Sequence, residues 1–278
     1  MSIFVFISVM FAALLHAGWN ALIKNGADKQ AGMLLLTLGH AFIGLCFIPF
    51  FPVPTGQVWF WLLASGIIHT FYQLFLGFAY ERGDLSRVYP IARGAAPMIV
   101  LVVSLLFDLD KLDFYDLIGA SVIGIGILLM GLGIFNLGED RKLIPLALGS
   151  AFATAGYSII DGMGARLMGD AFAYVSWLLI FSAIFYVPVI FSIKGRSVFP
   201  KNRKQLSLGL LVGGTSFLTY AIVVWAMTQA PIAVVTALRE SSILFAVMIG
   251  CFFFGDRMTF NKILAAFVIV IGIVLTRY

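Results

Sequence analysis

The feature of this sequence that most constrains its fold is a succession of long apolar segments separated by short polar connections. A helix of about 20 apolar residues is long enough to cross the hydrocarbon core of a bilayer, which is about 30 Å thick. We count ten such segments in the 278 residues: 3–23, 33–51, 58–79, 88–107, 114–135, 145–164, 171–193, 206–228, 231–254 and 260–276. The sequence therefore predicts an all-α polytopic membrane protein with about ten transmembrane helices.

The composition excludes a soluble protein. Hydrophobic residues make up 62% of the chain and charged residues 11%, whereas a soluble domain has roughly 45–50% and about 25%. The short connections leave no room for a soluble catalytic or nucleotide-binding domain, and the sequence contains no P-loop motif. No spacing of Cys, His, Asp or Glu suggests a metal site, so we expect no cofactor and no metal.

The basic residues predict an orientation in the membrane. They are scattered through the connections rather than gathered on one soluble face, which argues against nucleic acid as a partner. Alternate connections hold 13 Lys and Arg residues on one side and 3 on the other. Cytoplasmic connections carry the excess of positive charge, so we predict that both termini face away from the cytoplasm, which in a Gram-negative bacterium means the periplasm. The first segment has no basic n-region, and we interpret it as a retained span.

The second half of the chain repeats the first. Arg93 matches Arg239 at an offset of 146 residues, and residues 17–20 match residues 155–158 at an offset of 138. A charged residue that recurs inside an apolar span is not explained by shared apolar composition. We infer a duplicated unit of five spans.

An odd number of spans gives the two copies opposite orientations in the membrane. We assign residues 1–135 to the first five-helix repeat, 136–144 to a cytoplasmic connection and 145–278 to the second repeat. Inverted repeats of this kind are the basis of alternating access in many secondary transporters, with the substrate site near the midplane at the repeat interface.

Four segments carry a resemblance to a known family. LLHAGWNALIK (14–24), PIARGAAP (90–97), ALRESS (237–242) and FGDRMTFNKILAAFVIVIGIVL (254–275) resemble the EamA-type members of the drug/metabolite transporter superfamily. Asp256 stands where the family's short tail element usually has a glutamate. The resemblance implies a bacterial inner-membrane carrier of small metabolites, often an exporter of amino acids or related compounds, with a central cavity lined by both halves.

Two arginines lie inside predicted spans, namely Arg93 and Arg239. An arginine at the centre of a bilayer costs roughly 2.5–3.5 kcal/mol on insertion scales, so both should face the interior of the bundle. Their forked guanidinium groups suit a carboxylate or phosphonate of the substrate. The alternative is a structural ion pair with Glu240 or Asp161, or extension of the side chains back to the cytoplasmic interface.

Two carboxylates accompany these arginines. Glu240 directly follows Arg239, and adjacent helical residues point about 100° apart, so we expect the two to face different partners, with Glu240 reaching Arg93 from the other repeat. Glu240 could also bind a substrate ammonium group or carry a coupling proton. Asp161 lies near the end of the sixth span, close to Arg166, and we expect it to be a solvated helix end.

The three histidines of the chain, His16, His40 and His69, all fall in predicted spans. A neutral histidine that bonds to a neighbouring helix is the common case in such positions. His16 is the best candidate for function, because its spacing of i, i+3 and i+4 with Trp19 and Asn20 places the three on one helix face.

Aromatic residues are candidates for the walls of a central cavity. Trp19 and Asn20 share the face just described, and Tyr157 matches Trp19 in the second repeat. Tyr72 and Tyr220, on the third and eighth spans, could line the same cavity. The glycines of the fifth and tenth spans favour close helix packing, as a scaffold or as a dimer contact, so the sequence is compatible with a monomer or a homodimer.

We therefore predict a secondary transporter, working as an exporter, of a small anionic or zwitterionic metabolite such as an amino acid, organic acid or aminophosphonate. Its partners are the small-molecule substrate, a possible coupling proton and membrane lipids. Two alternatives stay open: a flippase for a lipid-linked substrate, with a lateral opening lined by polar residues, and an intramembrane enzyme. No paired nucleophile and base supports the enzyme.

Overall fold

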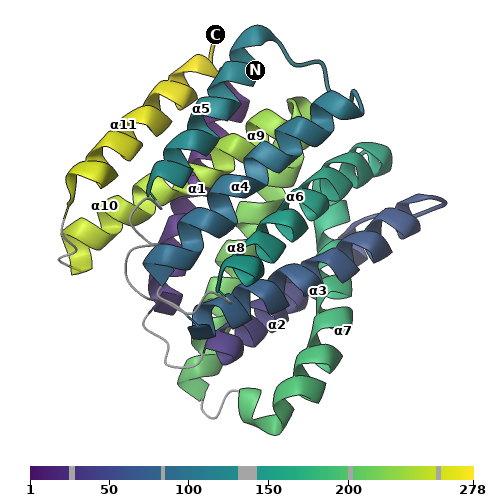
Figure 1. Ribbon diagram of the computed structural model, residues 1–278. Coiled ribbons are helices and arrows are strands. Elements are labelled where there is room, and N and C mark those ends of the chain that lie inside the picture. The colour runs from purple at the N-terminus through teal and green to yellow at the C-terminus, as the bar shows by residue number, and fades with distance from the viewer. Residues whose placement is uncertain (25–28, 83–84, 131–142, 200–202, 255–257) are drawn as a thin grey trace.

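The computed structural model of the protein describes residues 1–24, 29–82, 85–130, 143–199, 203–254 and 258–278, and within these ranges the secondary structure is helical without strands (Figure 1). The first half contains α1 (Ile3–Lys24), α2 (Lys29–Phe47), the short η1 (Ile48–Phe50), α3 (Val58–Arg82), α4 (Leu85–Leu106) and α5 (Phe114–Met130). The second half contains α6 (Leu143–Met168), α7 (Ala171–Lys194), the short η3 (Gly195–Val198), α8 (Arg203–Gln229), α9 (Ile232–Glu240), α10 (Ser242–Phe254) and α11 (Phe260–Leu275).

Where the structure describes them, the apolar segments expected from the sequence are mainly helical. Within the described ranges, seven helical segments are long and apolar enough to cross a membrane. Three further apolar helices are shorter, at Ala92–Leu106, Phe114–Met130 and Phe260–Leu275. The prediction of an all-α, multi-pass membrane protein is therefore confirmed.

One predicted span is not a single helix. The segment 231–254 was expected to be continuous, but it is divided at Ser241 into α9 and α10. The backbone N–H of Ser241 bonds to the carbonyl of Leu238 at 3.1 Å, and its hydroxyl bonds to the same carbonyl at 2.5 Å. This i to i−3 turn ends α9 by tightening its last turn. The apolar run continues through the break, which is why hydropathy alone did not reveal it.

The two repeats interleave. The most extensive helix contacts are formed between halves, by α3 with α6, α5 with α11, α2 with α8 and α4 with α6. The contact of α3 with α6 has its counterpart in that of α8 with α1, as duplication requires. Each repeat therefore buries its apolar faces mainly against the other, and the central interface contains side chains of both.

The two chain ends lie at the same end of the bundle (Figure 1). The guanidinium of Arg277 donates to the carbonyl oxygen of Met1 at 3.1 Å. This placement agrees with an even number of membrane crossings. Residues 136–142 of the predicted connection, and Asp256 of the family-like tail element, lie outside the described residues.

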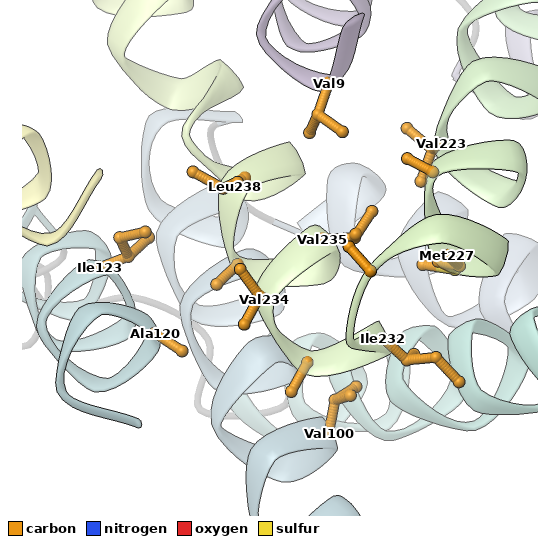
Figure 2. Close-up of a cluster of buried hydrophobic side chains, with 14 of the residues drawn as sticks. Val9, Val100, Ala120, Ile123, Val223, Met227, Ile232, Val234, Val235 and Leu238 are labelled. Carbon is orange, nitrogen blue, oxygen red and sulfur yellow. The ribbon is translucent and has the colours of Figure 1, made fainter. Parts of the chain in front are cut away.

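Helix α9 occupies the centre of one apolar core. Figure 2 shows its side chains surrounded by Val9 of α1, Val100 of α4, Ile123 of α5 and Val223 of α8. Every residue of α9 is buried, which is the expected environment of a helix that is apolar nearly all round. The helix thereby holds its polar carboxyl-terminal end inside the bundle.

The glycines of α5 and α11 allow these two helices to touch. A Cβ atom at Gly272 would lie 2.7 Å from the backbone nitrogen of Ile123, and one at Gly119 would lie 2.8 Å from that of Thr276. No side chain fits at such distances, so the helices pack backbone to backbone. The predicted role of these glycines as a scaffold contact is thus fulfilled within one chain.

Candidate functional site

Three charged residues meet inside the bundle. Arg93 comes from α4, and Arg239 and Glu240 form the end of α9. Both arginine side chains are 3% exposed and that of Glu240 is fully buried. Arg93 Nη1 donates to both carboxylate oxygens of Glu240 at 3.3 Å, while Arg239 Nε and Nη2 donate to Oε1 at 3.0 and 2.5 Å. One carboxylate thus serves two guanidinium groups, which leaves the trio with a formal net charge of +1.

The pairing of Arg239 with its neighbour Glu240 corrects the sequence-based expectation that the two face different partners. The angle of about 100° between adjacent side chains does not prevent this pairing. The long flexible stem of Arg239 carries its guanidinium far enough from the backbone to reach the neighbouring carboxylate. Glu240 also reaches Arg93 from the other repeat, as predicted. In this structure Arg93 and Arg239 are thus both paired with Glu240, which was the alternative to substrate binding that the sequence left open.

Arg93 has two further polar neighbours. Its Nη2 lies 2.9 Å from His16 Nε2 on α1 and 3.4 Å from the hydroxyl of Tyr72 on α3. Arginine can only donate, so the Nε2 atom of His16 must accept and this histidine is neutral. We call Arg93, Arg239, Glu240, His16 and Tyr72 the arginine cluster.

A second buried cluster surrounds Asp161 of α6. The carboxylate is 0% exposed. Its Oδ1 accepts hydrogen bonds from the hydroxyl of Ser65 and, at 3.4 Å, from that of Tyr174. Its Oδ2 accepts from His69 Nε2 at 3.1 Å and from the hydroxyl of Tyr220. These partners come from α3, α7 and α8, and we call the five residues the aspartate cluster.

The aspartate cluster corrects the expectation that Asp161 is a solvated helix end. Helix α6 continues to Met168, so Asp161 lies two turns before its end and is covered by neighbouring helices. Arg166, the expected neighbour, pairs with Asp110 at 2.7 Å instead. It also donates to the carbonyls of Met227 and Ala230, at 2.9 and 3.1 Å.

Tyr157 of α6 joins the two clusters. Its ring stacks on the imidazole of His69 with a centroid distance of 4.2 Å, and the guanidinium carbon of Arg239 lies 5.6 Å from the ring centre. Edge-on contacts to Tyr72 at 5.3 Å and Tyr220 at 6.0 Å complete its surroundings. An arginine over an aromatic face is a favourable cation–π arrangement. The Tyr157 ring therefore contacts members of both the arginine cluster and the aspartate cluster.

Comparison with known proteins identifies the family. The sequence profile described as "EamA-like transporter family" matches residues 3–132 and, a second time, residues 141–278. The chain belongs to the EamA-like transporter family. The two matches show the two-repeat architecture and identify the protein as a membrane transporter of small molecules.

One solved structure, described as "Crystal structure of protein", is similar to this EamA-like transporter with a TM-score of 0.75. The alignment covers 98% of each chain at 16% sequence identity, a likeness that shows the fold alone. No curated protein matches the chain.

Most of the predicted binding residues of this EamA-like transporter lie together, but two are less directly involved. Trp19 is buried and makes an edge-on contact with His16 of the arginine cluster at 4.8 Å. The side-chain amide of Asn20 donates to the carbonyl of His16 at 2.8 Å and so is directed to its own helix. Their roles as cavity walls stay predictions.

Sequence reasoning did not find the aspartate cluster. Ser65 and His69 are spaced i, i+4 on α3 and therefore share a face, and Asp161 is an acidic residue in an apolar segment. Both features are visible in the sequence, but Asp161 lies 92 or more positions from His69 and Ser65 in the chain. Only the packing of α3 on α6 brings them together.

A separate cavity opens at the end of the bundle where α2 begins and where α3 and α7 end. Its volume is about 560 Å³. The residues that line it are Lys29, Gln30, Tyr80, Glu81, Lys194, Ser197 and Val198. At the opposite end of α7, the described residues include the Arg166 network, which ties the α4–α5 connection to α6 and α8.

Proposed function

We propose that the protein is a secondary transporter of a small anionic or zwitterionic metabolite that works by alternating access, with the arginine cluster as its anion-binding site. The observation that carries the proposal is the buried charge of the trio. Two guanidinium groups, each 3% exposed, share a single carboxylate. A net positive charge in a membrane protein interior is costly, and an anionic substrate group would neutralise it.

The break between α9 and α10 supports this assignment. Secondary transporters commonly form their substrate sites where a membrane helix is discontinuous, because the broken ends free polar backbone groups near the midplane. Arg239 and Glu240 are the last two residues of α9, directly before the break at Ser241. In the first repeat the corresponding helix α4, which holds Arg93, is continuous. The site would therefore combine one rigid and one hinged element.

We assign the following roles. Arg93 and Arg239 hold the carboxylate or phosphonate of the substrate through bidentate hydrogen bonds. His16 and Tyr72 orient the Arg93 guanidinium, and Tyr157 packs against the organic part of the substrate. Glu240 holds the two arginines in place when the substrate is absent.

The two ends of the bundle suit alternating access. The Arg166 network joins both repeats at one end, and a cavity lies at the other. From the distribution of basic residues, we place the cavity on the cytoplasmic side of a bacterial inner membrane and the Arg166 network, with the termini, on the periplasmic side.

The test is a ligand screen followed by transport. Purified protein is screened by thermal shift against amino acids, organic acids, aminophosphonates and amines of matched size, since a ligand that binds only the folded state raises its stability. Compounds that stabilise the protein are then tested for uptake into proteoliposomes. We expect stabilisation and uptake of compounds with a carboxylate or phosphonate, and neither for the corresponding amines.

Three variants decide the role of the site. Arg93→Gln should abolish uptake while the protein stays folded, and Arg93→Lys should restore part of it because the charge is retained without the fork. Arg277→Gln is the matched control, since Arg277 bonds only to a terminal carbonyl in the described region. Undiminished uptake by Arg93→Gln would refute the site. Stabilisation by lipids alone would favour the flippase.

A further inference from the structure

We infer that Asp161 and His69 form a proton-binding site, separate from the arginine cluster. The use of that proton for transport rests on the proposed function, but the site itself does not. It is built from side chains of four helices, which are buried except for the half-buried Tyr220. It assigns the coupling proton to a residue pair other than Glu240.

The two buried carboxylates of the interior differ in how their charge is balanced. Glu240 contacts two guanidinium groups, which are permanently charged. The described residues that bond to Asp161 are three hydroxyl groups and one imidazole, none of which carries a permanent charge. A buried carboxylate without a counter-charge is unfavourable. Of these partners only His69 can supply a positive charge, and it does so by binding one proton.

The geometry favours a proton over other cations. Each oxygen of Asp161 already accepts two hydrogen bonds, which fill the positions available to a carboxylate. A metal ion or a substrate ammonium group would have to displace one of these donors. The described residues also contain no group of three potential metal ligands. A proton that adds to Nδ1, the other nitrogen of the His69 ring, leaves all four contacts of Asp161 in place.

Other titratable groups on neighbouring helices surround Asp161 and His69. Tyr174 of α7 and Tyr220 of α8 bond to Asp161. Tyr157 of α6 and Tyr72 of α3 contact the His69 ring. Among the residues that the structure describes, His40 of α2 also interacts electrostatically with His69, and Arg239 of α9 does so with Tyr220.

Protonation of the pair would change the charge of the whole interior. Neither charge contacts the other directly. The formal charges of the two clusters sum to zero without the proton and to +1 with it. The Tyr157 ring contacts a member of each cluster, at 4.2 and 5.6 Å. For charges about 10 Å apart at an effective dielectric constant of about 20, Coulomb's law gives roughly tenfold to twentyfold tighter binding of an anion to the protonated form. Proton and anion would therefore bind cooperatively.

The site can be tested without a substrate. Protein labelled with ¹⁵N-histidine is reconstituted in lipid nanodiscs, and the imidazole resonances are followed between pH 5 and 9. The chain has 3 histidines, so single His→Gln variants assign the signals. We expect the His69 ring to bind and release a proton reversibly in this range, and Asp161→Asn to weaken that binding, because the anion that stabilises the imidazolium is lost.

Two further variants complete the experiment. Tyr220→Phe removes one hydrogen bond from Asp161 and leaves the carboxylate, so the midpoint should move to higher pH even if Asp161→Asn fails to fold. Asp170→Asn is the matched control, since its carboxylate caps α7 at Ala173 N, and it should leave the midpoint unchanged. A His69 signal that does not titrate in folded protein, or that titrates alike in Asp161→Asn and Tyr220→Phe, would overturn the inference. Neither outcome depends on Arg93 or on transport, so the two proposals fail separately.

Discussion

Substitution of Glu240 by glutamine tests the charge balance of the arginine cluster most directly. The change preserves the size of the side chain and removes the only carboxylate that the described structure places against both arginines. Two guanidinium groups, each 3% exposed, would then lie together without a counter-charge. Breaking a buried ion pair by removing one partner costs about 3–5 kcal/mol, and we expect a loss of unfolding free energy in that range.

The Arg93→Gln variant should be less harmful. In Arg93→Gln, Glu240 keeps both hydrogen bonds from Arg239, at 3.0 and 2.5 Å. No charge is left without a partner, and we expect a loss of about 1.5–3 kcal/mol, typical of a hydrogen bond to a charged group. The order of stability should therefore be wild type, then Arg93→Gln, then Glu240→Gln.

Thermal unfolding in detergent, followed by tryptophan fluorescence, measures these differences. At roughly 2–4 °C per kcal/mol for a chain of this size, Glu240→Gln should lower Tm by about 10 °C. The matched control is Glu81→Gln, which breaks an ion pair of 2.8 Å with Lys194 whose side chains are 32% and 34% exposed. Exposed pairs contribute at most about 1 kcal/mol, so its Tm should barely change. A Tm for Glu240→Gln equal to or above that of Arg93→Gln would refute the reasoning.

Three other predictions concern the scaffold and the orientation. Arg166→Gln should lower the free energy of unfolding by about 1–3 kcal/mol because a hydrogen-bonded charge is lost. In a double-mutant cycle this loss should not add to that of Asp110→Asn, because the two residues share one ion pair. Gly272→Ala should be destabilising by about 1–3 kcal/mol, since its Cβ would meet a backbone nitrogen of α5 at 2.7 Å, whereas Gly18→Ala, with nothing within 4 Å, should be neutral or stabilising in a thermal melt. A cysteine introduced at Tyr278, in a variant lacking the native cysteines, should react with a membrane-impermeant thiol reagent in intact spheroplasts, and protection until lysis would reverse the predicted orientation.

Much of the fold could be predicted from the sequence. The helices follow from the length of each apolar segment, because in a bilayer the backbone must satisfy its own hydrogen bonds within the segment. Arg93 and Arg239 were recognisable as interior residues for a similarly local reason, since a charge in an apolar span has to face away from lipid. The repeat was visible because these two residues recur in register.

Other features depended on which helices pack together. Glu240 could be assigned to both arginines only once α4 lay beside α9, and Asp161 could be recognised as an interior residue only once α3, α7 and α8 covered it. The break at Ser241 was equally hidden, because it replaces one backbone hydrogen bond by another without any change in hydropathy.

The sequence by itself thus determined which segments are helical and that Arg93 and Arg239 must lie inside the bundle, because both depend on whether a local stretch of chain is stable in contact with lipid. Tertiary structure decided which charge balances which. Asp161 and His69 are 92 residues apart in the chain, and Arg93 and Glu240 are 147 apart. Such pairs form across the interface of the two repeats, where the position of each side chain depends on the packing of helices far away in the sequence.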